Sequence, residues 1–438
     1  MRQAAFNRSF HWVVLLACAW LGACDGRLNG PGGGTGGSGS PGFFFGEDSP
    51  PHPSVRLVSA ATGADLVQVD WILSALEEPL PELALFIAES GGDPFASAPR
   101  PVDALAGRAR FGGLAANTSY KLGLGISDGA GGWQQSGPLL RVRTGGVIYA
   151  DANSSSTAQD GLTPETAYSD IFLAVISAFA QGGGNVWIAE GTFTNVAFPM
   201  FEGVSLHGGF APGFQLEQRD VRDHPTVLLG LSGANVVSMD QLISRPVIDG
   251  LLIDGLGFSE NGIDNKQTDC ELRSTSVRGC GRGIKLRTPE TEDAPDVRLF
   301  ECDLFENLVE GFSIAGPADV RGSGTLFRDN GAEGMDADDW VAPAGVTLDI
   351  HLSDCAFLRN GSEGLDLDLA APGTGGSIGG RFELELVDCD FESNVAAGLL
   401  IDLEYEASPA WQARLELRGL RARNNGGSGV HLDLDGPA

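Results

Sequence analysis

The sequence predicts an all-β protein in which a small sandwich of antiparallel sheets precedes a long solenoid of stacked parallel sheets. Three observations support this prediction: a motif that returns along the second half of the chain, alternating apolar residues on both sides of it, and a separate region of alternating strands before it. Each short repeat is too small to bury its own apolar face, so it must stack on its neighbours, as the coils of a solenoid do.

The first 23 residues have the pattern of an export signal. Arg2 and Arg8 precede an apolar run, Trp12 to Trp20, which is too short to span a bilayer. The run ends at Leu21-Gly22-Ala23-Cys24, and this segment resembles the lipobox of bacterial lipoproteins. The resemblance implies that residues 1–23 are a signal peptide, that cleavage occurs before Cys24 and that lipid is attached to its thiol. Cys18 is a weaker alternative because the apolar run before it is very short.

Residues 24–50 are expected to form a tether. After Cys24 they are mostly Gly, Ser and Pro, a composition that cannot bury an apolar face. We therefore expect an exported protein held to a bacterial membrane by lipid, at the outer membrane or cell surface rather than at the inner membrane. Asp25 leaves that choice open, because an Asp after the lipidated Cys favours the inner membrane in some bacteria.

Residues 51–145 have the alternation of a small all-β domain. Apolar residues alternate along 67–71 and again along 83–87, which predicts two strands. The segment from Leu114 to Leu124 resembles the corner of a fibronectin type III domain, in which Tyr120 would lock the two sheets together. Trp71 falls where that family places its core Trp. The resemblance implies a fibronectin type III-like β-sandwich and carries no information about a ligand.

Residues 146–438 are predicted to form the solenoid. Its opening segment has a strand pattern at 147–151, apolar residues at helical spacing over 171–179 and a return to strand at 186–193. This order resembles the start of the pectin-lyase-like right-handed parallel β-helices, in which a short N-terminal helix caps the first coil. The resemblance implies the fold more firmly than an activity, because that superfamily includes polysaccharide lyases and hydrolases as well as members without a known reaction.

The repeated motif is C-x-x-x-x-N-x-x-x-G followed by an apolar residue. Six copies, some without the Cys, begin at intervals of roughly 23 to 34 residues, which lies within the range of stacked repeats. We predict that the Asn side chains hydrogen-bond up and down a column at a bend. We also predict that the Asn, and the Gly four residues later, allow the left-handed backbone that a sharp bend requires. The predicted column consists of Asn307, Asn330, Asn360, Asn394 and Asn425.

Five of the seven cysteines fall within the solenoid. Their spacing follows the repeat, which favours free thiols stacked in the core over a disulfide framework. A disulfide between Cys270 and Cys280 remains an alternative. Zinc is not expected, because the chain has neither a C-x-x-C nor an H-E-x-x-H segment.

The outward-facing positions after each repeat Gly contain the candidate metal ligands. Residues two and four positions after the Gly should point out of the sheet, and the middle coils carry aspartates there. Stacked carboxylates repel one another unless they are solvated or hold a cation, and their hard oxygens suit Ca²⁺. A Ca²⁺ site and a solvated acidic face are the two interpretations. The candidate ligands are Asp336, Asp338, Asp366, Asp368 and Asp402.

Insertions in the loops after these strands are expected on the same flank of the solenoid, where binding surfaces of repeat proteins often lie. Trp340, Tyr405 and Trp411 lie in or beside these insertions and are candidates to stack on sugar rings. The alternative is that the three rings only cover the sheet.

Three functions remain open from the sequence. The first is a non-catalytic module that binds a polysaccharide or a cell-surface protein through the acidic face with Ca²⁺. The second is a Ca²⁺-dependent lyase of acidic polysaccharide, with Lys285 or Arg287 as the base. The third is a structural spacer at the cell surface.

The composition excludes some partners. The chain has 58 acidic and 28 basic residues and a net charge of −30, which argues against binding to nucleic acid or to anionic lipid surfaces. The two folded units are expected to share only a short junction around Gly145 and Gly146 and to unfold separately. No segment remains after the last strand, at 430–435, to cover the final coil, so we expect either a weak end-to-end homodimer or a frayed final repeat.

Overall fold

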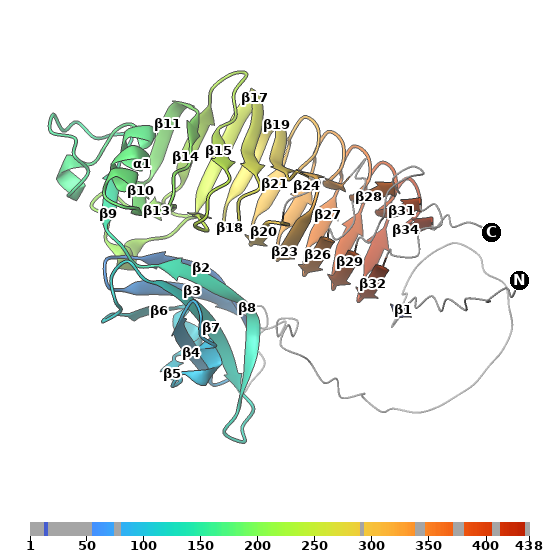
Figure 1. The fold of residues 1–438 in the computed structure, drawn as a ribbon, viewed down its shortest axis with the longest axis horizontal. Coiled ribbons are helices and arrows are strands. Elements are labelled where there is room, and N and C mark those ends of the chain that lie inside the picture. Colours follow the sequence, from blue (N-terminus) through green and yellow to red (C-terminus); the bar gives the residue numbers. More distant parts are fainter. Residues whose placement is uncertain are drawn as a thin grey trace, which may run out of the picture.

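The computed structural model describes residues 13–15, 55–73, 80–289, 293–337, 347–370, 381–404 and 412–433. Residues 55–143 form two antiparallel sheets, and residues 147–433 form parallel sheets that run the length of a β-helix (Figure 1). The sandwich lies alongside the N-terminal half of this solenoid. Among the described residues, no helix has the length and apolar character that crossing a membrane requires.

The first unit is a sandwich of a three-stranded and a four-stranded sheet. Tyr120 lies at the corner between the sheets, where its hydroxyl accepts a hydrogen bond from the Ala115 amide at 2.9 Å. Trp71 is buried in the core and donates from Nε1 to the Ala104 carbonyl at 3.1 Å. The strands are β2 (Val55–Thr62), β3 (Val67–Leu73) and β6 (Arg108–Phe111) in one sheet, and β5 (Arg100–Val102), β4 (Leu83–Glu89), β7 (Ser119–Ser127) and β8 (Trp133–Arg143) in the other.

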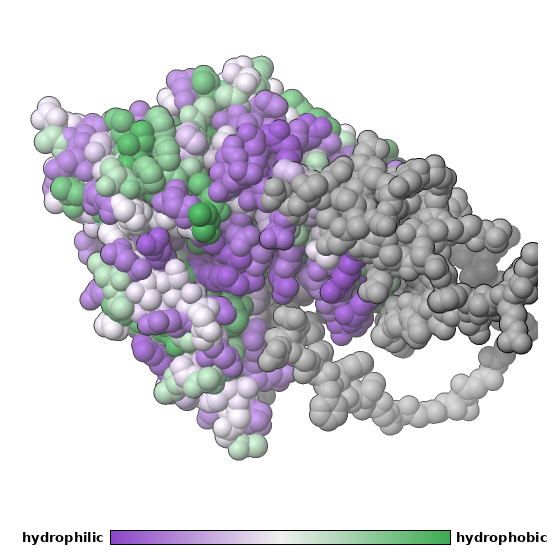
Figure 2. Space-filling model, viewed as in Figure 1, coloured by the Kyte–Doolittle hydropathy of each residue, from purple (hydrophilic) through white to green (hydrophobic). Residues whose placement is uncertain are grey.

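The solenoid begins with β9 (Val147–Ala150) and the helix α1 (Ile171–Ala180). The helix starts there because the Asp170 carboxylate accepts a hydrogen bond from the Phe172 amide at 2.8 Å. One face of α1 packs into the core of the first coils, while Leu173, Ile176 and Phe179 remain exposed. Apolar residues accordingly gather at this end of the surface in Figure 2, whereas hydrophilic residues gather over the middle coils.

Each later coil has three short strands, and equivalent strands stack in parallel. The first stack runs β10 (Gly184–Ala189), β13 (Val204–Phe210), β16 (Val247–Asp249), β18 (Cys270–Arg273), β20 (Asp296–Phe300), β23 (Ala318–Ser323), β26 (Thr347–Ser353), β29 (Arg381–Val387) and β32 (Gln412–Arg418). The second runs β21 (Asp303–Phe305), β24 (Leu326–Arg328), β27 (Ala356–Leu358), β30 (Asp390–Glu392) and β33 (Arg421–Arg423).

The third stack holds the strands that follow the repeat Gly. It runs β19 (Ser276–Arg287), β22 (Phe312–Ala315), β25 (Met335–Ala337), β28 (Leu365–Ala370), β31 (Leu399–Glu404) and β34 (Val430–Asp433). β19 is long enough to pair with both β21 and β22, so it joins the second and third stacks. The early coils add β11 (Gly191–Val196), β12 (Phe198–Pro199), β14 (Thr226–Gly230), β15 (Val237–Asp240) and β17 (Leu251–Lys266).

The predicted asparagine column is confirmed. From Asn307 to Asn394, each side-chain amide donates to the side-chain oxygen of the next Asn at 3.0 Å. Each amide also donates to a backbone carbonyl of the preceding coil, so both of its hydrogens are used. The column therefore ties each coil to the coils on both sides of it.

The predicted backbone role of Asn and Gly is wrong. The left-handed residue at this bend is the one before each Asn, with φ of 52° at Glu306 and 55° at Arg359, and the repeat glycines do not have positive φ. Gly364 is required for a different reason. A Cβ there would lie 2.5 Å from the carbonyl oxygen of Gly398 and 2.9 Å from Cβ of Phe357. The Gly thus permits a close approach between coils.

The core of the solenoid is a set of columns of like side chains. Phe327, Phe357 and Phe391 stack with ring centroids 4.7 and 4.9 Å apart and planes within 4°. The five cysteines of the solenoid are free and buried, so Cys270 and Cys280 do not form the alternative disulfide. Burial raises the pKa of Cys302 to about 12, which keeps its thiol neutral.

The expectation that the sandwich and the solenoid share only a short junction is wrong. Arg273, fully buried on β18, donates from Nη1 to the Ala60 carbonyl on β2 at 3.1 Å. Arg108 of β6 reaches the carbonyls of Glu217 and Arg219 at 2.7 Å each. Phe300 of the solenoid packs into the core of the sandwich. The two units therefore form one docked body.

Buried charges lie under this contact. Asp249 is fully buried and accepts from Arg219 at 2.8 Å and from the Ala60 amide at 3.4 Å. Despite its burial, the Arg219 and Arg273 guanidinium groups and His207 hold the pKa of Asp249 well below its usual value. Burial lowers the pKa of His207, whose Nε2 lies 3.1 Å from the side-chain oxygen of Asn185.

At the far end, the final coil is less covered than the middle coils. Val430 and Leu432 of β34 are 40% and 38% exposed. On the opposite side of that coil, β1 (Val13–Leu15) pairs in parallel with β32. Among the described strands, β34 pairs with β31 on one side only.

Candidate functional site

The outward positions of the third stack form a continuous row. In register across five strands lie Asp264 of β17, Lys285 of β19, Ser313 of β22, Asp336 of β25 and Asp366 of β28. Neighbouring residues in such a row are about 4.8 Å apart, which is the spacing of parallel strands. The row thus brings one lysine, one serine and three aspartates into register on one side of the sheet.

A second acidic column lies directly before the repeat glycines, at Glu310, Glu333 and Glu363. Carboxylate oxygens of Glu333, Glu363 and Asp366 all lie within 4.8 Å of one another, and all three side chains are partly buried. This cluster, which we call the carboxylate triad, joins the glutamate column to the aspartate row.

Negative charge is concentrated at the triad. Burial raises the pKa of Glu333, and the charges of Glu310 and Glu363 raise it further. Glu310 itself is paired with Arg282 at 2.7 Å, so that arginine is already engaged beside the triad. Three partly buried carboxylates at this separation repel one another, and a hard divalent ion relieves the repulsion with the ligand atoms that Ca²⁺ takes.

The other predicted metal ligands lie outside the carboxylate triad. Asp336 lies in register beside Asp366, but it is buried, at 7% exposed, and not on an open face as the sequence led us to expect. Asp368 and Asp402 are in register with each other on β28 and β31, two residues further along those strands, and neither belongs to the triad. Asp338, together with the aromatic candidates Trp340, Tyr405 and Trp411 and the lipidation candidate Cys24, lies outside the described residues.

The two predicted bases differ in their surroundings. The Arg287 guanidinium is bound to Asp264, with Nη2 2.6 Å from Oδ2, and Asp264 is only 2% exposed. This ion pair commits the guanidinium to Asp264. Lys285 is partly buried and its ammonium group pairs with no described residue. Of the two, Lys285 is the one with an uncommitted side chain.

Glu333 and Glu363 were missed from the sequence because outward positions were counted only after the repeat Gly. A signal for them was present. The pair Glu-Gly recurs at 310–311, 333–334 and 363–364, always three residues after the column Asn. A carboxylate repeated at one position of a solenoid must stack with its equivalents.

Comparisons with known proteins match solved structures only. No protein-family model matches the chain, and no curated protein matches it. The chain is similar to the family 28 exopolygalacturonase of Yersinia enterocolitica at 11% identity and a TM-score of 0.31, covering 89% of this chain and 100% of that one. It is also similar to the A-module of a mannuronan C-5 epimerase from Azotobacter vinelandii at 13% identity and a TM-score of 0.27, covering 66% and 96%. A third match is the catalytic domain of an α-1,3-glucanase at 11% identity and a TM-score of 0.25, covering 86% and 87%.

Proposed function

We propose that this protein is an exported lipoprotein whose solenoid binds an acidic glycan through a Ca²⁺ ion held by Glu333, Glu363 and Asp366. The observation that carries the proposal is the convergence of these three carboxylates within 4.8 Å on two adjacent coils. Ca²⁺ takes six to eight oxygen ligands, so a site with three protein carboxylates leaves positions for a carboxylate and hydroxyls of a sugar.

The neighbouring residues suit the same ligand. Lys285 lies two strands from Asp336 in the row, about 10 Å along the solenoid by strand spacing. A glycan chain lying along the row would thus meet a fixed cation at one sugar and an ammonium group at another. The stacked strands fix the backbone positions from which both groups project.

The proposed anchoring rests on Leu21 to Cys24, and cleavage before Cys24 would remove β1 with the signal peptide. Cys24→Ser should therefore give an unlipidated protein that no longer partitions into detergent. Unchanged mass and partitioning in this variant would show that Cys24 is not the anchor.

A second candidate, a Ca²⁺-dependent polysaccharide lyase, is favoured by the unpaired ammonium group of Lys285. In its neutral form this amine would take the C5 proton of a uronate whose carboxylate is bound to Ca²⁺. The electron pair would form the C4–C5 double bond as the C4–O bond breaks. A structural spacer remains the third hypothesis, and it predicts neither binding nor turnover.

One experiment separates the three. A soluble chain from residue 50 onward is run through affinity gels containing acidic polysaccharides, with Ca²⁺ or with chelator, and ultraviolet absorbance of unsaturated products is followed in parallel. Retardation that needs Ca²⁺, without product, supports the binding module. Product that is lost in Lys285→Met supports the lyase. Neither retardation nor product on any polysaccharide contradicts both.

A further inference from the structure

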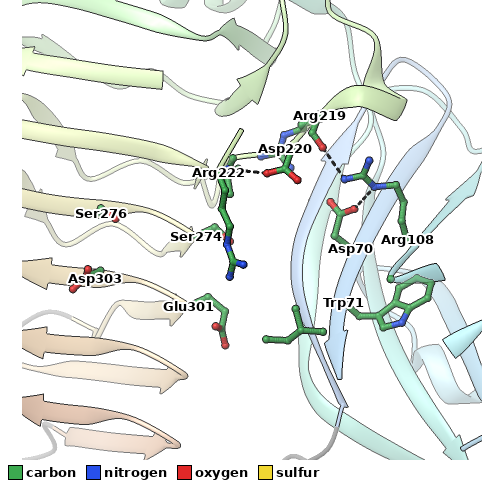
Figure 3. Close-up of a pocket in the computed structure, with 13 residues that line it drawn as sticks. Asp70, Trp71, Arg108, Arg219, Asp220, Arg222, Ser274, Ser276, Glu301 and Asp303 are labelled. Carbon is green, nitrogen blue, oxygen red and sulfur yellow. Dashed lines mark hydrogen bonds and ion pairs between the residues drawn. The ribbon is translucent and has the colours of Figure 1, made fainter. Parts of the chain in front are cut away.

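A cleft of about 530 Å³ lies between the sandwich and the solenoid (Figure 3), and none of its lining residues belongs to the carboxylate triad. Its walls are β3 of the sandwich at Asp70–Ile72, the loop Arg219–Arg222, and the bends of two successive coils at Ser274–Ser276 and Glu301–Asp303. Its volume is within the range of small-molecule sites, which is roughly 300 to 1,000 Å³.

The cleft is formed in advance of any ligand. The hydrogen bonds of Arg108 and Arg273 described above tie the sandwich to the solenoid on either side of it. The walls are therefore held at a fixed separation. A preformed cleft binds a small ligand without the cost of ordering its walls.

Most charges in the lining are already bound to protein groups. Asp70 accepts from Arg108 at 2.5 Å, and Asp303 is paired with Arg328 at 2.7 Å. Arg219 is held by Asp249 below the floor of the cleft. The Asp220 carboxylate accepts from the Arg222 amide at 2.8 Å, which fixes the turn that carries the Arg222 side chain.

Arg222 is the exception. Its exposed side chain extends into the cleft past Ser274 and toward Glu301 in Figure 3, and its guanidinium forms no hydrogen bond or ion pair with any described residue. Its five N–H donors are available for a planar anion, and a carboxylate matches their geometry with two parallel hydrogen bonds. The lining also holds the carboxylates of Asp70, Asp220, Glu301 and Asp303, so Arg222 is the group in it that offers uncommitted donors to an anion.

The remaining lining selects the class of ligand. Ser276 lines the cleft, and its hydroxyl makes no hydrogen bond with a described residue, so it is free to bind a hydroxyl group. The one aromatic ring in the lining, Trp71, is 3% exposed, with its Nε1 already bound to Ala104. No face is offered to stack a nucleobase or to bury an acyl chain. The lining suits a small, hydroxyl-rich acid.

We propose that this cleft is a binding site for an acidic saccharide, with Arg222 holding the carboxylate and Ser276 a ring hydroxyl. The site is independent of the carboxylate triad and requires no metal. It would make the sandwich a part of a binding site rather than a spacer.

The test is a calorimetric titration of the full chain in detergent micelles, with chelator present, using trigalacturonate as the probe and its fully methylated ester as the neutral counterpart. We expect saturable binding of the acid, at least about tenfold weaker binding of the ester, and at least about tenfold weaker binding of the acid by Arg222→Gln. Arg423→Gln, which removes another exposed arginine from the solenoid, is the matched control and should bind as the wild type does.

The melting temperature of Arg222→Gln should stay close to that of the wild type, because the exposed guanidinium forms no hydrogen bond or ion pair with a described residue. Absence of binding, equal binding of acid and ester, or unchanged binding by Arg222→Gln would each overturn the proposal. Because chelator removes Ca²⁺, none of these outcomes depends on the triad.

Discussion

Replacing Asn360 by Ala should destabilise the solenoid far more than replacing Asn425, although the two residues occupy the same position of the repeat. The Asn360 side chain is fully buried and takes part in four hydrogen bonds. It donates to the carbonyl of Phe327 and to Asn394, and it accepts from both the backbone and the side-chain amide of Asn330.

The expected magnitude follows from these bonds. A buried hydrogen bond contributes a net of about 1 kcal/mol, and a partner left without one costs about 1 to 3 kcal/mol, so the loss in Asn360→Ala should be about 4 kcal/mol. Asn425 ends the column and is only half buried, with three bonds. Water can replace some of these hydrogen bonds, so Asn425→Ala should lower the unfolding free energy by only about 1 to 2 kcal/mol.

The assay is urea denaturation followed by circular dichroism. The dependence of the unfolding free energy on urea concentration is compared among the wild type and both variants. Equal losses in the two variants, or a loss below about 1 kcal/mol in Asn360→Ala, would refute the view that the column binds the coils together.

Four further predictions concern packing, docking, pH dependence and the final coil. Gly364→Ala should lower the melting temperature because its Cβ would meet the next coil's carbonyl at 2.5 Å, whereas Gly112→Ala, where a Cβ meets nothing within 4 Å, should not. Asp249→Asn should cost about 3 to 5 kcal/mol, since it leaves the buried Arg219 guanidinium without its counter-charge, and should split one melting transition into two. A single transition of unchanged midpoint would refute the docking account. The pKa of His207 is lowered in the folded state, so the stability that it contributes is present above its unfolded pKa of about 6.5 and is lost as pH falls below that value. The decline in melting temperature between pH 7.5 and 5.5 should therefore be smaller in His207→Gln than in the wild type. Backbone amides of 430–433 should exchange faster than those of 365–368 in the monomer, and equal protection without a dimer in light scattering would mean that the last coil is capped.

Contacts between coils could be predicted from the sequence where one residue type recurs at one position of the coil. The asparagine column follows directly from such recurrence, because equivalent residues of adjacent coils must stack. The left-handed residue before each Asn was not predictable in the same way, since Glu306, Arg359 and Ser393 share no chemistry that marks the backbone. The role of the repeat Gly depends on a distance between coils, which no single repeat contains.

The docking of the sandwich was missed because its contacts join residues that are far apart in the chain. Ala60 meets Asp249 and Arg273 at separations of 189 and 213 residues. Charged residues are also expected at the surface, so the burial of Asp249 and Arg273 could not be predicted from the sequence. The interdomain cleft follows from this docking and was equally hidden.

The most direct test of the proposed function is a Ca²⁺ titration of the chain from residue 50 onward, with the melting temperature as the measurement. Binding to the folded state alone should stabilise the wild type by about 2.7 kcal/mol once Ca²⁺ reaches about 100 times its dissociation constant. Glu333→Gln combined with Asp366→Asn should abolish the rise, while Asp65→Asn combined with Asp223→Asn, which changes the charge equally at two exposed sites, should retain it. The account would be contradicted if the melting temperature of the wild type did not change with Ca²⁺ and the triad variant were more stable than the wild type. That result would identify the triad as a solvated acidic patch.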